Sequence, residues 1–254
     1  MVTLLLGLFV PGSAAAQTFL PRSEDYTLRL EYLWWSPRPT GQIQKGLGDF
    51  EGTLLEIDED LGIEKGKANT FHGVLRLGGA WKLRGGWTDL DFSGDVFAAR
   101  PFLYGTLVTR SGDQVVTSLK GNLITADVEW DFVLQDGGFL GAFAGVRFFD
   151  VDTLMVNVAT ANRVAETDRL PVPVLGLAGR AYLGERISLE GEVAGITAGS
   201  RGHLWEWAVA LRIHATQNVA GTTGYRSLSL EGRDDRDFFG LKLRTWTFGL
   251  EISL

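Results

Sequence analysis

The chain has 254 residues, with 33 glycines, 15 phenylalanines, 8 tryptophans, no cysteine and a net charge of −7 at pH 7. The absence of cysteine excludes disulfides and thiolate metal sites. The acidic balance argues against binding to the phosphate backbone of nucleic acid. Glycine and aromatic residues at this frequency favour strands and turns over a helical bundle.

The N-terminus, MVTLLLGLFVPGSAAAQ, has the pattern of a secretory signal peptide. An apolar run from Val2 to Val10 leads to Ala14-Ala15-Ala16, the small-residue pattern of a signal-peptidase site. No Lys or Arg precedes this run, which indicates an atypical signal or a start upstream of Met1. The alternative is a buried N-terminal strand or helix. We predict a signal peptide over residues 1–16 and one mature domain over residues 17–254.

Further along the chain, ten segments alternate between apolar and small or polar residues, which is the period of a β-strand. They cover residues 26–35, 71–81, 83–88, 124–132, 140–148, 175–181, 187–193, 205–213, 219–226 and 246–254. The alternation breaks parity near Leu90, Phe139 and Leu228, where we expect bulges or one-residue errors in the strand bounds.

The connections between these segments alternate in length. The short ones lie around Lys82 and at 135–138, 184–186 and 215–218, and the mostly long, polar ones cover 37–69, 93–116, 153–171, 197–204 and 231–240. Strict alternation of this kind is typical of an up-and-down barrel with turns at one end and loops at the other. The segment 93–116 is apolar enough to extend the sheet beyond a membrane.

Alternation alone does not separate a soluble barrel from a membrane barrel, because the two differ only in which face is outside. Five tryptophans fall near strand ends on the apolar face, where an interfacial aromatic belt lies in a membrane barrel. They are Trp34, Trp81, Trp87, Trp205 and Trp246. No segment reaches the roughly 18 apolar residues of a membrane-spanning helix. A soluble exported β-protein is the alternative.

We therefore predict an all-β fold: a single closed antiparallel up-and-down transmembrane β-barrel of ten strands, or of eight if two segments prove to be loop. The final segment, WTFGLEISL, would pair with the first strand near Tyr26–Tyr32, with Leu250 and Ile252 facing lipid. An even number of strands would place both termini at the periplasmic end of a barrel in the bacterial outer membrane.

The terminal strand, the alternating connections and the signal resemble the integral outer-membrane β-barrel proteins of Gram-negative bacteria. More narrowly, EIDEDLGI, LRGGWTDLDFSGD, LPVPVLGLAGRAYLGERISLEGEVAGI and GYRSLSLEG resemble an uncharacterised group of small barrels. The resemblance implies an outer-membrane location. It also implies outer-membrane lipid and lipopolysaccharide, periplasmic chaperones and the barrel-assembly machinery as partners. It implies no established activity. Leu254 departs from the Phe or Trp that most often ends such chains.

The face opposite the apolar one carries charges of both signs in nearly equal number. The basic residues are Arg29, Arg76, Arg84, Arg147, Arg180, Arg212 and Arg226, and the acidic ones are Glu31, Asp127, Glu129, Asp131, Glu190, Glu192, Glu206 and Glu251. Long charged side chains would meet across a narrow ten-stranded bore. We expect them to form ion pairs that close the lumen. A water-filled lumen is the alternative.

Several titratable residues fall at the expected loop-end rim, namely His72, Asp89, Asp91, Asp150, Asp152 and His203. An Asp–His pair could activate water as a general base, but a solvated rim is the favoured interpretation. The cluster IDEDLG lacks the spacing of an EF-hand, so we predict no metal site and no cofactor. The sequence favours a structural or surface-interaction barrel without enzymatic activity. An outer-membrane hydrolase and a small, porin-like passive pore are the alternatives.

Overall fold

A computed structural model describes residues 24–234 and 236–254, so the predicted signal peptide over residues 1–16 lies outside the described residues. The strands are β1 (Leu28–Trp35), β2 (Arg38–Gln44), β3 (Leu55–Glu56), β4 (Gly66–Gly78), β5 (Trp81–Phe97), β6 (Phe102–Tyr104), β7 (Leu107–Thr109), β8 (Gln114–Gln135), β9 (Gly138–Asn157), β10 (Asn162–Tyr182), β11 (Ile187–Thr197), β12 (Gly202–His214), β13 (Val219–Asp234) and β14 (Asp237–Ser253). A 3₁₀ turn, η1 (Gly199–Arg201), precedes β12. Within the described part of the chain, no helix is long and apolar enough to cross a membrane.

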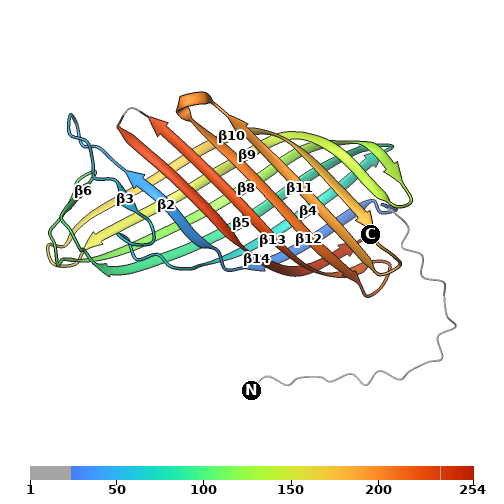
Figure 1. Ribbon diagram of the computed structural model, residues 1–254, viewed down its shortest axis with the longest axis horizontal. Coiled ribbons are helices and arrows are strands. Elements are labelled where there is room, and N and C mark those ends of the chain that lie inside the picture. Colours follow the sequence, from blue (N-terminus) through green and yellow to red (C-terminus); the bar gives the residue numbers. More distant parts are fainter. Residues whose placement is uncertain (1–23, 235) are drawn as a thin grey trace, which may run out of the picture.

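The sheet closes on itself as a ten-stranded antiparallel barrel (Figure 1). β1 and β2 form one barrel strand interrupted at Ser36 and Pro37, because both pair with β14 in a single continuous register. The other nine barrel strands are β4, β5 and β8 to β14, each paired with its neighbours in chain order. Leu30 pairs with Ile252 and Tyr32 with Leu250, which confirms the predicted closure of the last strand on the first. Because β1 pairs with β14 on one side and with β4 on the other, the described barrel has no free sheet edge over Leu28–Trp35.

Several connections predicted as loops are strands instead. β9 continues to Asn157 and β10 begins at Asn162, so the expected loop at 153–171 is a hairpin with a short turn. β13 and β14 likewise extend to Asp234 and from Asp237 through the expected loop at 231–240. The two long connections are 45–65, which contains β3, and 98–113, which contains β6 and β7. Figure 1 shows both at one end of the barrel, called here the loop end, and short turns at the other, the turn end.

The apolar face of a barrel strand is the outer face near the turn end and the inner face near the loop end. Strand β5 shows this reversal most clearly. Near the turn end, Lys82 and Arg84 are buried inside while Trp81, Leu83 and Trp87 are exposed outside. Beyond Thr88 the pattern reverses. There Leu90 and Phe92 are buried inside, whereas Asp89 and Asp91 lie on the outer row of the same strand.

This reversal explains the parity breaks in the sequence. The pairing of β5 with both neighbours runs through Leu90 without a register shift, and that of β13 runs through Leu228 in the same way. The bulges expected at Leu90 and Leu228 are therefore wrong, because what changes there is the surrounding solvent and not the backbone. Register shifts occur at Arg76/Gly78 and at Asp131/Val133, the latter beside the pairing of Leu134 with Phe139.

Strand length gives the physical reason for the reversal. β8 has 22 residues, which at ~3.4 Å per residue is about 75 Å of strand. Tilted by roughly 40°, such a strand rises about 55 Å along the barrel axis, whereas the lipid-facing band of a membrane barrel is about 25 Å tall. About half of the barrel therefore extends beyond the bilayer into water. There the inside must be apolar and the outside polar, as in a soluble barrel.

The reversal predicts opposite outcomes for one substitution at two positions on the outer face of β8. Val128→Arg places a charge in the apolar band and should cost roughly 2–4 kcal/mol of folding free energy. Ser118→Arg lies on the same face beyond the band and should change stability by less than about 0.5 kcal/mol. Urea titration of both variants folded in lipid vesicles measures the difference. Equal costs at the two sites would place the boundary elsewhere.

Candidate functional site

The lumen near the turn end is filled by an ion-pair network centred on Glu251. Its Oε2 atom lies 2.6 Å from Arg212 Nε and 2.7 Å from Arg180 Nη2. Glu190 contacts the same two guanidinium groups, at 2.7 Å from Arg212 Nη1 and 2.5 Å from Arg180 Nη2. Arg29 lies 3.9 Å from Glu251. Each carboxylate is therefore shared by several cations, and the charges of this cluster compensate one another.

Two further clusters continue the network. Arg147 lies 2.6 Å from Asp127 and 2.7 Å from Glu206. Arg84 joins Glu129, at 2.8 Å, to Glu192. Two more cations, Lys82 and Arg226, take part in the network. Lys82 Nζ is 2.8 Å from Asp131, 3.1 Å from Glu129 and 3.4 Å from Glu24. Arg212 is also 2.8 Å from Glu31, and Arg226 is 3.7 Å from Glu206.

Five of these pairs connect strands that are not neighbours in the sheet. Arg84 on β5 reaches Glu192 on β11, Arg180 on β10 reaches Glu251 on β14, and Arg147 on β9 reaches Glu206 on β12. These pairs bridge the bore, whereas most other pairs of the network join neighbouring strands along the wall. A chain of buried ion pairs across a narrow barrel blocks passage and ties opposite walls together.

The structure places the inward charges expected from the sequence inside the barrel, with one difference. Arg76 lies at the turn end, where its guanidinium donates to the carbonyl oxygens of Glu24 and Gly79. Sequence analysis missed Lys82 and Glu24. Lys82 shares the inward parity of Arg84, but its segment was assigned to a turn. Glu24 precedes the first alternating segment and carries no signal of its own.

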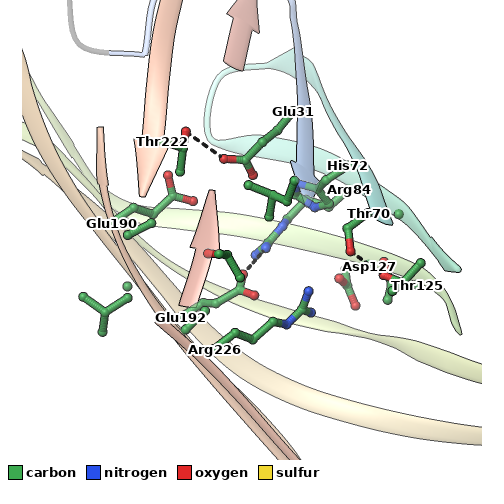
Figure 2. Close-up of a pocket in the computed structure, with 18 of the residues that line it drawn as sticks. Glu31, Thr70, His72, Arg84, Thr125, Asp127, Glu190, Glu192, Thr222 and Arg226 are labelled. Carbon is green, nitrogen blue, oxygen red and sulfur yellow. Dashed lines mark hydrogen bonds and ion pairs between the residues drawn. The ribbon is translucent and has the colours of Figure 1, made fainter. Parts of the chain in front are cut away.

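The network surrounds a polar chamber in the lumen, shown in Figure 2. The side chains around it include Glu31, Thr70, His72, Arg84, Thr125, Asp127, Glu190, Glu192, Thr222 and Arg226. On its loop-end side, the Thr70 and Thr88 hydroxyls lie 2.8 Å apart and Trp35 Nε1 donates to Thr70 Oγ1 at 3.1 Å. Hydroxyl groups thus separate the charged layer from the layer above.

That upper layer is apolar. Its inward side chains include Trp35, Leu90, Phe92, Leu119, Leu123, Phe149, Leu228, Leu230, Leu241 and Leu243, all of them buried. They come from six different strands, β1, β5, β8, β9, β13 and β14, and pack into one cluster inside the bore. The expected ion-paired lumen therefore accounts for the turn-end half of the barrel only. The loop-end half is closed by hydrophobic packing.

The two long connections seal the loop end. Leu55, Ile57, Leu61 and Ile63 from the first connection are almost completely buried, and so is Leu107 of the second. The connections are hydrogen-bonded to each other, with Thr53 N–H donating to Leu103 O at 2.7 Å and Leu103 N–H to Thr53 Oγ1 at 3.0 Å.

The first connection also approaches the barrel wall closely. A Cβ atom at Gly94 would lie 2.0 Å from the carbonyl oxygen of Leu61, so β5 requires glycine where the connection crosses it. Polar contacts fix its edges: Lys45 Nζ lies 3.1 Å from Glu166 and Arg100 Nη2 lies 2.8 Å from Asp60. Ion pairs, apolar core and connections together form a continuous plug along the described barrel.

The rim residues expected to carry chemistry are not brought together as an Asp–His pair. His72 does not lie at the rim, because it faces the lumen and lines the polar chamber. Asp89, Asp91, Asp150 and Asp152 lie on the outer rows of β5 and β9, on the opposite face of the sheet. His203 Nδ1 is 4.0 Å from Glu231, and Asp150 is 3.4 Å from Arg169. These contacts suit a solvated outer surface.

The other sequence-predicted features are placed as follows. Trp34, Trp87, Trp205 and Trp246 are exposed on the outer face near the level where hydrophobicity reverses, and Trp81 lies at the turn end. Trp81 packs against Trp130 in a tilted arrangement and Trp246 packs against Tyr225 edge to face, with ring centroids 6.5 and 5.5 Å apart. In the acidic stretch, Asp60 binds Arg100 and Glu56 binds Gln42. Among the described residues, no group of three or more metal-ligating side chains is assembled.

The comparisons with solved structures agree with this architecture. The outer membrane protease OmpT from Escherichia coli superposes with a TM-score of 0.59 and 9% sequence identity, covering 92% of this chain and 100% of that chain. The translocator domain of the autotransporter NalP from Neisseria meningitidis gives a TM-score of 0.49 and 11% identity, covering 92% of this chain and 91% of that one. No family model and no curated protein matches the chain.

The chain has the fold of the Gram-negative outer-membrane β-barrel proteins. At this sequence identity the similarity shows a shared fold only, and it does not assign the activity of OmpT to this chain. The exposed apolar band and the closed sheet are the two properties that hydrocarbon demands of a spanning β-structure. The structure is thus a transmembrane barrel, and the narrower resemblance to an uncharacterised group stays a prediction.

Removing one shared carboxylate tests the ion-pair network. Glu251→Gln removes one of the two carboxylates that Arg29, Arg180 and Arg212 share, leaves Glu190 alone among these three buried cations, and should cost roughly 3–5 kcal/mol of folding free energy. Glu231→Gln, on the outer face beside His203, is the matched control and should change stability by less than about 0.5 kcal/mol. Urea unfolding followed by tryptophan fluorescence gives both values. Similar losses in the two variants would contradict a network at Glu251.

Asp60 makes the loop-end seal sensitive to acid. Partial burial opposes ionisation of Asp60, but hydrogen bonds from Arg100 and from the Glu56 N–H hold the pKa of its carboxyl below the ordinary value of 3.8. A depressed pKa stabilises the folded state above the ordinary value. That contribution is lost as the pH falls through the folded-state pKa.

We expect hydrogen exchange at Ile57 and Ile63, corrected for intrinsic rates, to accelerate between about pH 5 and pH 2. The Asp60→Asn variant should show the faster exchange already at neutral pH, because it removes the anion that Arg100 holds. Asp58→Asn, two residues away, is the control and should exchange like the unmodified protein. Unchanged protection in Asp60→Asn would show that the contact between Asp60 and Arg100 does not hold the first long connection in place.

Proposed function

We propose that the protein is an integral outer-membrane barrel that is closed to diffusion and acts through its surface at the loop end, in a structural or interaction role. The observation that carries this proposal is the plug, in which ion pairs, apolar side chains and the two long connections follow one another along the bore. A lumen filled by packed side chains over most of its length leaves no aqueous path for solutes.

The loop end has features of a contact surface. Phe50 in the first long connection is 73% exposed, and Phe97, at the end of β5, is 69% exposed. Val108 in β7 and Val158 in the turn after β9 are also exposed. Large apolar side chains held in water outside the lipid band favour binding of another molecule. This supports an interaction role over that of an inert anchor.

In this proposal the loop end faces the cell exterior and both termini lie in the periplasm. Folding would then use the periplasmic chaperones and the barrel-assembly machinery, as the sequence resemblance implies. The hydrolase alternative lacks support, because His72 and His203 meet none of the four rim aspartates. The passive-pore alternative requires an open lumen, which the packed upper layer opposes.

Planar-bilayer recording tests the proposal directly. The purified, refolded barrel should insert without steady conductance, since no continuous water path crosses it. A general-diffusion porin inserted into the same membrane is the control for detection. Steady, porin-like conductance of the unmodified protein without denaturant would overturn the proposed closed state.

A further inference from the structure

Three cations lie together on the outer face of β2 and β14. Arg38 is directly opposite Arg244 in the strand pairing, and Lys242 is the next outward residue of β14, opposite Thr40. All three are exposed. Like charges directly opposite each other destabilise a strand pair unless an anion lies between them.

No acidic residue of the described ranges, 24–234 and 236–254, neutralises this cluster. Among the described residues, Arg38, Lys242 and Arg244 form no ion pair within 4.0 Å, and their partners on β13 are Ser227 and Ser229. The next acidic residue on that face of β13 is Glu231. It lies opposite Gly240 and is directed to His203, at 4.0 Å. The cluster is therefore a concentrated positive patch with hydroxyl groups beside it.

Strands β4, β5, β8, β9 and β10 show how outward cations are normally compensated in this protein. Lys67 lies directly opposite Asp91, and Lys120 pairs with Asp91 on one side and Asp152 on the other. Arg169 lies 3.4 Å from Asp150. Those basic residues alternate with acidic ones along the sheet. The contrast makes the patch at Arg38, Lys242 and Arg244 a local exception.

The position of the patch identifies the kind of anion. Trp246 is the next outward residue of β14 toward the turn end, and it packs against Tyr225 with centroids 5.5 Å apart. Trp34 stacks on Phe248 one step further down, at 6.5 Å. Such exposed aromatic rings mark the membrane–water interface. The three cations directly beyond them lie at the level of lipid headgroups, where anionic groups attract basic side chains.

We propose that Arg38, Lys242 and Arg244 bind the phosphate groups of a phosphorylated glycolipid in the outer leaflet, with its acyl chains along Trp246 and Phe248. Guanidinium groups match phosphate through paired hydrogen bonds, and one bound phosphate would relieve the repulsion between Arg38 and Arg244. The proposal rests on the outward orientation of the loop end in the proposed function.

Native mass spectrometry of the detergent-solubilised full chain tests this site. The probes are diphosphorylated lipid A, the same lipid after enzymatic dephosphorylation, and phosphatidylglycerol. We expect the unmodified protein to retain diphosphorylated lipid A in preference to the other two. The Arg38→Gln/Lys242→Gln/Arg244→Gln variant should bind it on the order of 100-fold more weakly, since each of the three basic residues near a lipid surface contributes roughly a fivefold factor in affinity.

The matched control is Lys67→Gln/Lys120→Gln/Arg169→Gln, which removes three outward cations from the compensated side and should leave binding unchanged. Unaltered migration of unheated samples in gel electrophoresis shows that both triple variants fold. Equal binding by the patch variant and the unmodified protein would overturn the site. Equal retention of dephosphorylated lipid or phosphatidylglycerol, or displacement by excess inorganic phosphate, would overturn the glycolipid assignment.

The two proposals fail separately in these experiments. A conducting barrel that still retains lipid A through Arg38, Lys242 and Arg244 would end the proposal of a closed lumen and support the lipid site. A silent barrel whose patch variant binds lipid A normally would end the lipid site and leave the closed lumen in place.

Discussion

The constraint on which the whole structure depends is that each long strand passes through two solvents. In hydrocarbon the backbone must be fully paired and the outer side chains apolar, whereas in water the same outer face must be polar. One strand such as β5 meets both demands by exchanging the character of its faces at Thr88 without changing its register. The two kinds of lumen follow from this exchange. Where the outward row of a strand is apolar, its charged row faces the bore, and where the outward row is polar, its apolar row faces the bore.

Burying the charged side chains in the turn-end half of the lumen costs free energy, and their contacts must therefore be specific. Buried ions lose hydration, and only close, multiple contacts compensate for that loss. Glu251 meets three guanidinium groups and Lys82 meets three carboxylates, so most members of the network have more than one partner. The apolar half uses non-directional packing, and the threonine hydroxyls at Thr70 and Thr88 allow the two kinds of interior to meet.

The ten strands and the pairing of the last strand with the first near Tyr26–Tyr32 could be predicted from alternation and from the need for closure, because these two constraints leave few alternatives. The reversal was misread as bulges at Leu90 and Leu228, since alternation assumes one solvent along a strand. The extended hairpin at 153–171 was missed for the same reason: polar outward residues resemble a loop. Partners such as Arg180 and Glu251 are 71 residues apart, so only the closed geometry shows which charges meet.

The apolar plug also has a consequence for biogenesis. Its side chains come from the loop-end half of the strands and from the connections, and they can pack only after that half has emerged from the bilayer. Each large apolar side chain buried there contributes roughly 1.5–3 kcal/mol. For a barrel that enters the bilayer loop end first, the free energy gained when this core packs would oppose the return of the long connections through the lipid.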